Sequence, residues 1–195
     1  MRRNRVIINL AVVALFSALY FVFSRFLSIS ISMQFKISFV GVIVIYASIA
    51  FPLYTSLSIG IVGEFLCQLF SEYGLSPTTL LWMLPPLFRI IPIWLGYNLF
   101  RKKDIDLIES KKIVNYIFYF LICIFANLLL TGVNSLILFL DGLIMNYPSG
   151  LTLSIILIRF LVSFVNGTIS SLLVIPLYLA TKSQLIKIYS TEKNN

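Results

Sequence analysis

Long apolar runs, each of about the length that crosses a lipid bilayer, are the feature that most constrains this chain. An α-helix needs about 20 predominantly apolar residues to cross the hydrocarbon core. Runs of this kind fill most of the 195 residues, of which 59% are hydrophobic and only 11% are charged. A soluble domain averages about 45–50% apolar and about 25% charged residues. The sequence therefore excludes a water-soluble globule and predicts an all-α integral membrane protein with almost no mass outside the bilayer.

The apolar runs predict six transmembrane helices in a single domain that covers residues 1–195. We expect the spans at residues 6–25, 37–51, 53–71, 80–100, 113–140 and 151–181. The stretch 37–70 is ambiguous, because it can form one overlong helix or two short helices broken at Pro52. Proline lacks the N–H that an uninterrupted helix would use, which favours the break.

The distribution of basic residues decides between five and six spans. Of the 15 lysines and arginines, the N-terminus carries three, the loop at 101–112 carries five and the tail from Lys182 carries three. Six spans place all three clusters in the cytoplasm, as the positive-inside rule requires, whereas five spans would export the middle cluster. We therefore predict that both termini are cytoplasmic, and we interpret the net charge of +8 as topology rather than as a nucleic-acid footprint.

Four basic residues lie outside these clusters. Arg25 and Lys36 flank the first external loop, where a long side chain that reaches the interface explains them as well as a binding role does. Arg89 lies near the middle of its span, and Arg159 lies in the outer half of the last span. Neither can easily reach water, so we expect both to have a paired or functional role.

Acidic partners for these four cations are few. Glu64 lies in the third span, and Glu72 and Asp141 lie at outer helix ends. Glu64 can simply neutralise Arg89 or Arg159 as a structural pair. Four cations against three anions still leave a surplus of positive charge on the outer side. An outward-opening pocket with this surplus favours an anionic small molecule, because the planar fork of arginine gives a carboxylate two parallel hydrogen bonds.

Several sequence features that carry chemistry in other proteins are absent from this sequence. It has no histidine, which excludes a histidine proton relay and histidine metal ligands. It also has no G-x-x-x-x-G-K-[ST] loop for nucleotide phosphates and no G-x-S-x-G nucleophile elbow. We therefore expect no enzyme activity, no metal site and no cofactor held by this chain. An ATP-driven transporter built on it would take its ATPases from other polypeptides.

Two weaker patterns concern contacts between helices. Amides and a threonine recur inside the spans, where bonding between helices is the commoner explanation for each: Gln68, Asn127, Thr131, Asn134 and Asn166. In the first span Ala11, Ala14 and Ala18 form one stripe of small residues. The Ala14–Ala18 spacing allows close approach of a second helix, which is a weak indication of a partner subunit.

With six spans, an alanine stripe and a long first loop, the chain resembles the substrate-binding (S) subunit of an energy-coupling factor (ECF) vitamin transporter, of the folate type. The segments that carry the resemblance are Arg25-Phe26-Leu27-Ser28-Ile29, Phe35-Lys36-Ile37-Ser38-Phe39, Pro52-Leu53-Tyr54 with Gly60 and Gly63, Val133-Asn134-Ser135-Leu136, and Ile158-Arg159-Phe160. The segment 82–98 departs from that pattern, because it carries prolines and Arg89 where a helix rich in small residues is expected.

The resemblance implies a multi-pass protein of the bacterial plasma membrane that captures a vitamin at the outer face with high affinity. Such a subunit works with a transmembrane coupling subunit, which Ala11, Ala14 and Ala18 would contact, and with two ATPase subunits. A folate ligand would fit the cations. Its carboxylates would meet Arg25, Lys36 or Arg159, Glu64 or Asn134 would bond the pterin edge, and Arg89 would line the same site.

Three alternatives stay open at this point. The cargo can be pantothenate or another vitamin. A stand-alone secondary transporter would need carboxylates for a coupling ion at depth, and only Glu64 qualifies. A small membrane enzyme or assembly factor would have to place its chemistry in Glu64 and Arg89.

Overall fold

The chain folds into a helical bundle with one short β-hairpin. A computed structural model describes residues 2–32, 35–71, 74–103, 105–109, 112–146 and 152–190. The elements, in chain order, are α1 (Arg2–Arg25), β1 (Ser28–Ser32), β2 (Phe35–Ser38), α2 (Val40–Ala50), α3 (Leu53–Leu69), α4 (Thr79–Trp82), α5 (Pro85–Arg101), α6 (Ile113–Ile144) and α7 (Leu153–Ser190). Each of the six predicted spans overlaps a helix of 11 residues or more, and the span predicted at 80–100 is divided into the single turn α4 and the helix α5.

Membrane-length helices account for most of the bundle. Among the described residues, four segments are long and apolar enough to cross a bilayer: Val6–Arg25, Thr79–Arg101, Ile113–Ile144 and Leu153–Gln184. The remaining helices of some length, α2 and α3, are apolar but shorter. The structure thus confirms a mostly helical protein with several membrane-spanning candidates. That all six helices cross the bilayer, with both termini in the cytoplasm, stays a prediction.

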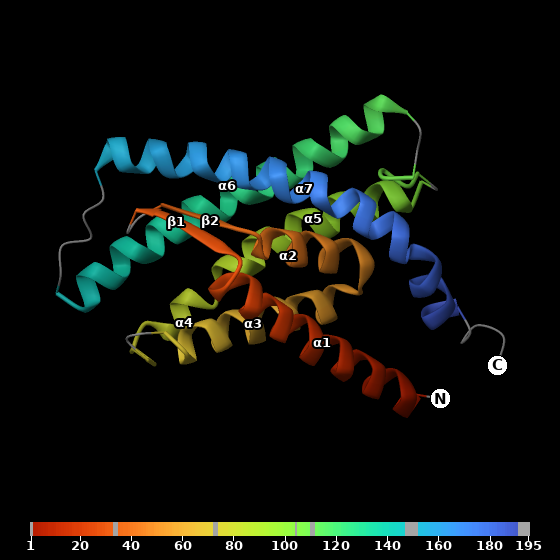
Figure 1. Cartoon of the computed structure of the whole chain (residues 1–195), viewed down its shortest axis with the longest axis horizontal. Helices are drawn as coiled ribbons and strands as arrows, with labels where there is room; N and C mark the ends of the chain where they lie inside the picture. Colours follow the sequence, from red (N-terminus) through yellow and green to blue (C-terminus); the bar gives the residue numbers. More distant parts are fainter. Residues whose placement is uncertain are drawn as a thin grey trace.

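The short helix α2 lies at the centre of the bundle, in contact with α1, α3, α5 and α7 (Figure 1). All of its residues from Val40 to Ile49 are buried. A helix that is apolar all round is stable only when it is covered on every side. At 11 residues it is about 16 Å long, roughly half of the hydrocarbon core, so its neighbours rather than lipid surround it.

Prolines set two of the helix boundaries. Phe51 is extended (φ −117°, ψ 161°) and Pro52 precedes the first residue of α3, as the sequence predicted. The hydroxyl of Ser56 donates to the carbonyl of Ala47 at 2.7 Å and holds the two helix ends together. Pro85 and Pro86 occupy the first turn of α5, where the missing N–H costs nothing.

The β-hairpin departs from the all-α prediction. Strands β1 and β2 pair antiparallel, with Ile29 opposite Ile37 and Ser28 opposite Ser38. The second predicted span, 37–51, therefore begins too early, because residues 37 and 38 belong to β2 and the helix begins at Val40. The alternation Ser-Ile-Ser-Ile-Ser from Ser28 to Ser32 has the two-residue period of a strand.

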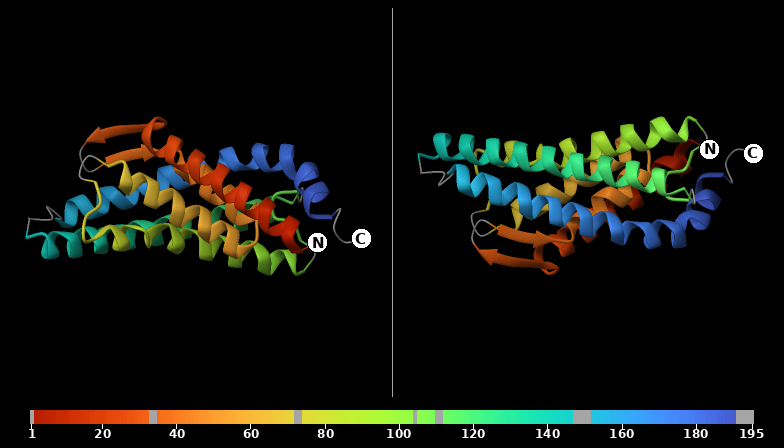
Figure 2. Two further views of the ribbon diagram at one scale, coloured as in Figure 1. Left: turned by 90° about the horizontal axis from the view of Figure 1, so that it is seen from below. Right: turned by 90° about the horizontal axis from the view of Figure 1, so that it is seen from above.

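The bundle has two distinct ends (Figure 2). The hairpin lies at one end, where α6 ends and α7 begins, and we call this the hairpin end. The start of α1, the end of α5 and the end of α7 lie at the other. The described members of the three clusters of basic residues lie at this second end, which we call the basic end.

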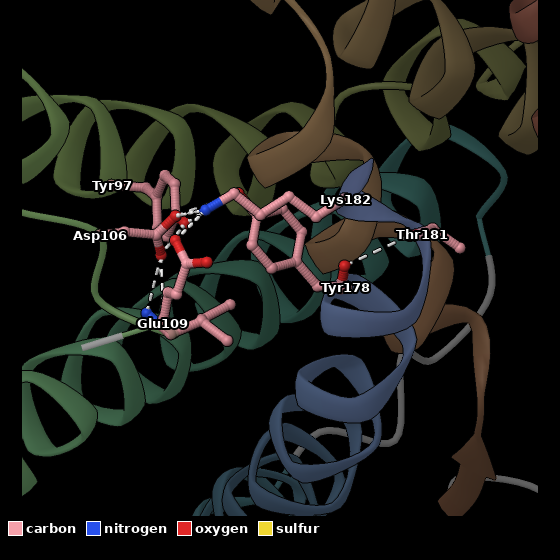
Figure 3. A network of polar contacts seen from close by, with 7 residues as sticks. Tyr97, Asp106, Glu109, Tyr178, Thr181 and Lys182 are labelled. Atoms are coloured by element: carbon pink, nitrogen blue, oxygen red, sulfur yellow. Dashed lines mark hydrogen bonds and ion pairs between the residues drawn. The ribbon is translucent and has the colours of Figure 1, made fainter. Parts of the chain in front are cut away.

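A polar network closes the basic end (Figure 3). Asp106, in the segment between α5 and α6, accepts hydrogen bonds from Tyr97 at 2.7 Å and from Tyr178 at 3.3 Å. Lys182 on α7 donates to Asp106 at 3.1 Å and also to Glu109. The adjacent Leu107 and Ile108 are fully buried in the main hydrophobic cluster. The segment 105–109 therefore packs into the bundle instead of extending into solvent.

Candidate functional site

A cavity of about 390 Å³ lies in the half of the bundle nearer the hairpin. The volume falls within the range of about 300–1,000 Å³ that is usual for small-molecule sites. Every helix from α1 to α7 and strand β2 contribute to its walls. The lining residues are Tyr20, Ser24, Ser38, Val40, Gly41, Glu64, Gln68, Trp82, Pro85, Pro86, Arg89, Asn127, Leu130, Thr131, Asn134, Arg159, Val162, Ser163 and Asn166. We call this space the ligand cavity.

The ligand cavity has a floor and a mouth, which the opposite directions of α6 and α7 define (Figure 2). Asn127 precedes Asn134 on α6 by seven residues, which is about 10 Å along the helix. On α7 the order is reversed, so that Arg159 lies toward the hairpin end and Asn166 lies deeper. Asn134 and Arg159 therefore line the mouth, whereas Asn127 and Asn166 line the floor.

Arg89 is the charged group of the floor. It is only 6% exposed, and its guanidinium donates to the side-chain oxygen of Asn127 on α6. The Nε atom of Arg89 is buried and has no hydrogen-bond partner among the described residues. A buried cation with an unused donor is costly, since it has lost its water and gained only part of the replacement. A ligand with an acceptor at this depth would complete the site.

Asn127 fixes the position of Arg89. Its amide nitrogen donates to the carbonyl of Cys123 at 2.8 Å, which leaves the amide oxygen turned toward the arginine. Its backbone carbonyl accepts the hydroxyl of Ser163 from α7 at 2.9 Å. The floor is thus a bonded unit of α5, α6 and α7, as is expected where polar groups must satisfy one another away from water.

The opposite wall carries an acidic group. Glu64 on α3 accepts a hydrogen bond from the hydroxyl of Tyr20 on α1 at 2.7 Å. The amide nitrogen of Gln68, one helical turn further along α3, donates to the other carboxylate oxygen of Glu64 at 3.0 Å. The ligand cavity therefore presents hydrogen-bond donors from α5 and α7 and a carboxylate from α3, with neutral amides and hydroxyls between them.

The cavity brings together four of the six residues that the sequence predicted for a binding site: Glu64, Arg89, Asn134 and Arg159. Arg25 is not among the lining residues. Its guanidinium donates to the carbonyl of Cys67 at 3.2 Å and to that of Phe70, at the C-terminal end of α3. Lys36 belongs to β2, but its side chain lies outside the described residues.

Sequence reasoning undervalued several lining residues. Asn127, Asn166, Gln68 and Thr131 all line the cavity, although each taken alone is explained by contacts between helices. The signal that could have found them is the recurrence of polar side chains inside three different spans. Trp82, on α4, also lines the cavity.

The predicted partner face is open. Ala11, Ala14 and Ala18 are exposed on α1, on the side that does not pack against α2 and α3. Small side chains there leave the backbone of α1 accessible to another helix.

Comparison with known protein families shows which family the chain belongs to. The model of the family described as ECF-type riboflavin transporter, S component, matches residues 4–183, which include every helix of the ligand cavity. No curated protein and no solved structure matched the chain. The expectations of an ECF S component, of a multi-pass membrane protein and of a transporter subunit rather than an enzyme are thereby confirmed. A match over almost the whole chain shows that this protein belongs to the family of ECF-type riboflavin transporter S components.

Proposed function

We propose that this chain binds riboflavin in the ligand cavity and delivers it to the cell interior together with a coupling subunit and two ATPase subunits. The observation that carries the proposal is the ligand cavity, whose lining combines two aromatic side chains, Tyr20 and Trp82, with many neutral hydrogen-bonding groups. The name of the matching family points to the same vitamin.

The chemistry of riboflavin fits this lining. Riboflavin is an uncharged molecule with a flat tricyclic ring, a row of oxygen and nitrogen acceptors along one edge, and a chain of four hydroxyl groups. The amides of Asn127, Asn134, Asn166 and Gln68 can each donate and accept, as hydroxyl groups require. Trp82 offers a face on which a flat ring can stack.

The cations of the cavity suit the acceptor edge of the ring. The Nε atom of Arg89 is an unused donor at the floor, and Arg159 makes no hydrogen bond with another described residue. An arginine can donate to two neighbouring acceptors at once because its donors lie in one plane. A neutral ligand with adjacent carbonyl and nitrogen acceptors would therefore be held without carrying a full negative charge.

Folate is the second candidate, and the charge of the cavity favours it. Two arginines, Arg89 and Arg159, face one carboxylate, that of Glu64, so the lining has a surplus of positive charge. The carboxylates of folate would meet Arg159 at the mouth, and Glu64 or Asn134 would bond the pterin edge. Arg25 would take no direct part, since its guanidinium is bound to the end of α3.

Equilibrium binding to the purified protein tests the proposal. Riboflavin should quench the fluorescence of Trp82 and bind with high affinity, while folate and pantothenate at the same concentrations should compete weakly. Arg89→Gln and Arg159→Gln should each weaken riboflavin binding about tenfold or more, because each removes a charged donor from the cavity. Arg25→Gln should change it by less than about twofold.

The outcomes separate the alternatives. Tight binding of folate without riboflavin would replace the first candidate by the second. Absence of binding by all three vitamins would contradict the proposed function of the cavity. Riboflavin uptake by vesicles that contain this chain and no ATPase would instead establish a stand-alone transporter.

A further inference from the structure

A second cavity, of about 200 Å³, lies at the basic end of the bundle, remote from the ligand cavity. It is enclosed by the last turn of α2, the connection to α3 and the second half of α5. Its lining residues are Ser48, Ile49, Ala50, Phe51, Pro52, Trp94, Tyr97, Asn98 and Arg101. The two cavities have no lining residue in common. We call this space the basic-end cavity.

One wall of the basic-end cavity is a row of hydrogen-bond donors. Trp94, Asn98 and Arg101 are spaced at i, i+4 and i+7 on α5, so they lie on one face of that helix. None of these three side chains makes a hydrogen bond or an ion pair with another described residue, whereas Tyr97 is bonded to Asp106 (Figure 3). No acidic residue is among the described residues that line this cavity. A ligand group that binds this wall would therefore be an anion or a strong hydrogen-bond acceptor.

The opposite wall offers acceptors. The last carbonyl groups of a helix lack partners within it and carry its partial negative charge. At the end of α2 the carbonyl of Ala47 is satisfied by the N–H of Phe51 at 3.0 Å and by the hydroxyl of Ser56 at 2.7 Å. The carbonyl of Ser48 has no such donor four residues on, because residue 52 is a proline. A ligand group that binds this wall would therefore be a hydrogen-bond donor.

The surroundings indicate a membrane lipid. Arg101 is followed by Lys102 and Lys103, both exposed, at the end of the molecule where the basic clusters gather. Tryptophan is enriched at the membrane–water interface, and basic pockets between transmembrane helices on the cytoplasmic side bind anionic headgroups. A cavity of about 200 Å³ has room for a headgroup but not for acyl chains, which would lie outside against the apolar helix faces.

We propose that the basic-end cavity binds the headgroup of a phospholipid of the inner leaflet. The phosphodiester would accept hydrogen bonds from Trp94, Asn98 and Arg101, and a donor on the headgroup would bond the carbonyl end of α2. Phosphatidylglycerol, with its hydroxyls, and phosphatidylethanolamine, with its ammonium, both have this combination. Phosphatidylcholine has the same phosphodiester but a headgroup that cannot donate.

Native mass spectrometry of the detergent-purified protein tests this proposal. The protein is incubated with phosphatidylglycerol, phosphatidylethanolamine or phosphatidylcholine of identical acyl chains. We expect one retained molecule of either of the first two lipids, at about tenfold lower concentration than is needed for phosphatidylcholine. Arg101→Gln should weaken retention about tenfold, Arg101→Lys should restore part of it, and Trp94→Phe should weaken it by a smaller factor because only the indole N–H is lost.

Lys103→Gln is the matched control, since it removes one exposed positive charge two residues from Arg101 and does not line the cavity. It should leave lipid retention unchanged. The melting temperature should be equal in the wild type and in Arg101→Gln without added lipid, which would show that the variant is folded whichever vitamin the ligand cavity binds.

Three results would overturn the proposal. Equal retention of all three lipids would show that the end of α2 selects no headgroup. An equal loss in Lys103→Gln and Arg101→Gln would show attraction by diffuse charge instead of a built site. Stabilisation of the protein by inorganic phosphate to the same extent as by phosphatidylglycerol, and lost in Arg101→Gln, would show an anion site that does not bind lipid.

Discussion

Arg89 lies where four helices meet, and two glycines make room for it. A methyl group added at Gly41 on α2 would collide with the guanidinium of Arg89 and with the hydroxyl of Ser170. One added at Gly167 on α7 would lie 2.7 Å from the amide nitrogen of Asn127. The floor of the ligand cavity is therefore determined by glycine on two helices as much as by the polar residues on the other two.

The first prediction concerns Gly41. Gly41→Ala should weaken riboflavin binding about tenfold or more and destabilise the protein by about 1–3 kcal/mol, because Arg89 and Ser170 must both move. Equilibrium binding and thermal unfolding of the same preparation measure the two effects.

Gly132→Ala provides the matched control within a helix. The nearest atom that its methyl group would meet is the ring of Phe160, at 3.9 Å, so the substitution is sterically free. It should leave binding unchanged and stabilise α6 by up to about 1 kcal/mol through helix propensity. If Gly41→Ala and Gly132→Ala had the same riboflavin affinity and the same stability, the close packing of Gly41 against Arg89 would not be needed for binding.

At the scale of single residues, the sequence identified the charged members of the cavity and Asn134, but missed most of its neutral members. Arg89, Arg159 and Glu64 stand out because an ionised group inside a span requires an explanation. An amide such as Asn127 does not, since bonding between helices explains it equally well. Arg25 shows the reverse error, because a cation at a helix end satisfies the carbonyls of a neighbouring helix as readily as it binds a ligand.

At the scale of elements, one proline predicted a helix boundary correctly, whereas the polarity of the first loop concealed a β-hairpin. Pro52 correctly predicted the boundary between α2 and α3. Its missing N–H interrupts helical hydrogen bonding locally, so the effect does not depend on the rest of the fold. Sequence reading predicts a loop where the hairpin lies, because its serines make the segment from Ser28 to Ser38 look polar. Pairing of its two strands depends on residues up to ten positions apart, which reading the segment residue by residue does not reveal.

A second prediction concerns Asp106, which links α5 to α7 outside the spans. Burial raises the pKa of this carboxyl, but hydrogen bonds from Tyr97, Lys182 and the N–H groups of Glu109 and Ile108 lower it further, so that the pKa lies below its ordinary value. The ionised form is therefore the one that the fold stabilises. This stabilisation is fully present above the unfolded pKa of about 4 and is lost as the pH falls through the lower folded value.

Asp106→Asn should accordingly lower the melting temperature at neutral pH, by an amount equivalent to about 1.5–3 kcal/mol. It should also flatten the fall of the melting temperature between about pH 5 and pH 2. Glu109→Gln removes only an exposed ion-pair partner of Lys182 and should cost less than about 1 kcal/mol. Equal effects of the two variants would contradict the assignment of Asp106 as the centre of the network.

A third prediction concerns the exposed face of α1. Ala14→Leu adds bulk to the small-residue stripe without touching the ligand cavity, since Ala14 is exposed and is not a lining residue. It should leave riboflavin binding by the isolated chain unchanged and reduce co-purification with the coupling subunit by about tenfold or more. Ala180→Leu, at an exposed alanine of α7, serves as the control and should assemble normally.

At the scale of the whole molecule, the orientation in the membrane can be tested by thiol labelling. Cys67 and Cys123 are both buried, so the natural protein should react slowly. The positive-inside rule predicts that the basic end faces the cytoplasm. With Lys103→Cys, a membrane-impermeant maleimide should then label the protein only after the cells are permeabilised. With Leu75→Cys, an exposed residue between α3 and α4 at the hairpin end, labelling should occur in intact cells. The reverse pattern would show that the termini lie outside.

The plugged basic end has a kinetic consequence for the whole assembly. Leu107 and Ile108 fill the bundle on the side away from the ligand cavity, and that cavity is lined only in the hairpin half of the described structure. We therefore expect the protein to carry one bound molecule at a time, because the described structure offers the cargo no continuous path from the ligand cavity to the basic end. Uptake should therefore level off at a rate proportional to the number of copies in the membrane, however much vitamin is supplied outside.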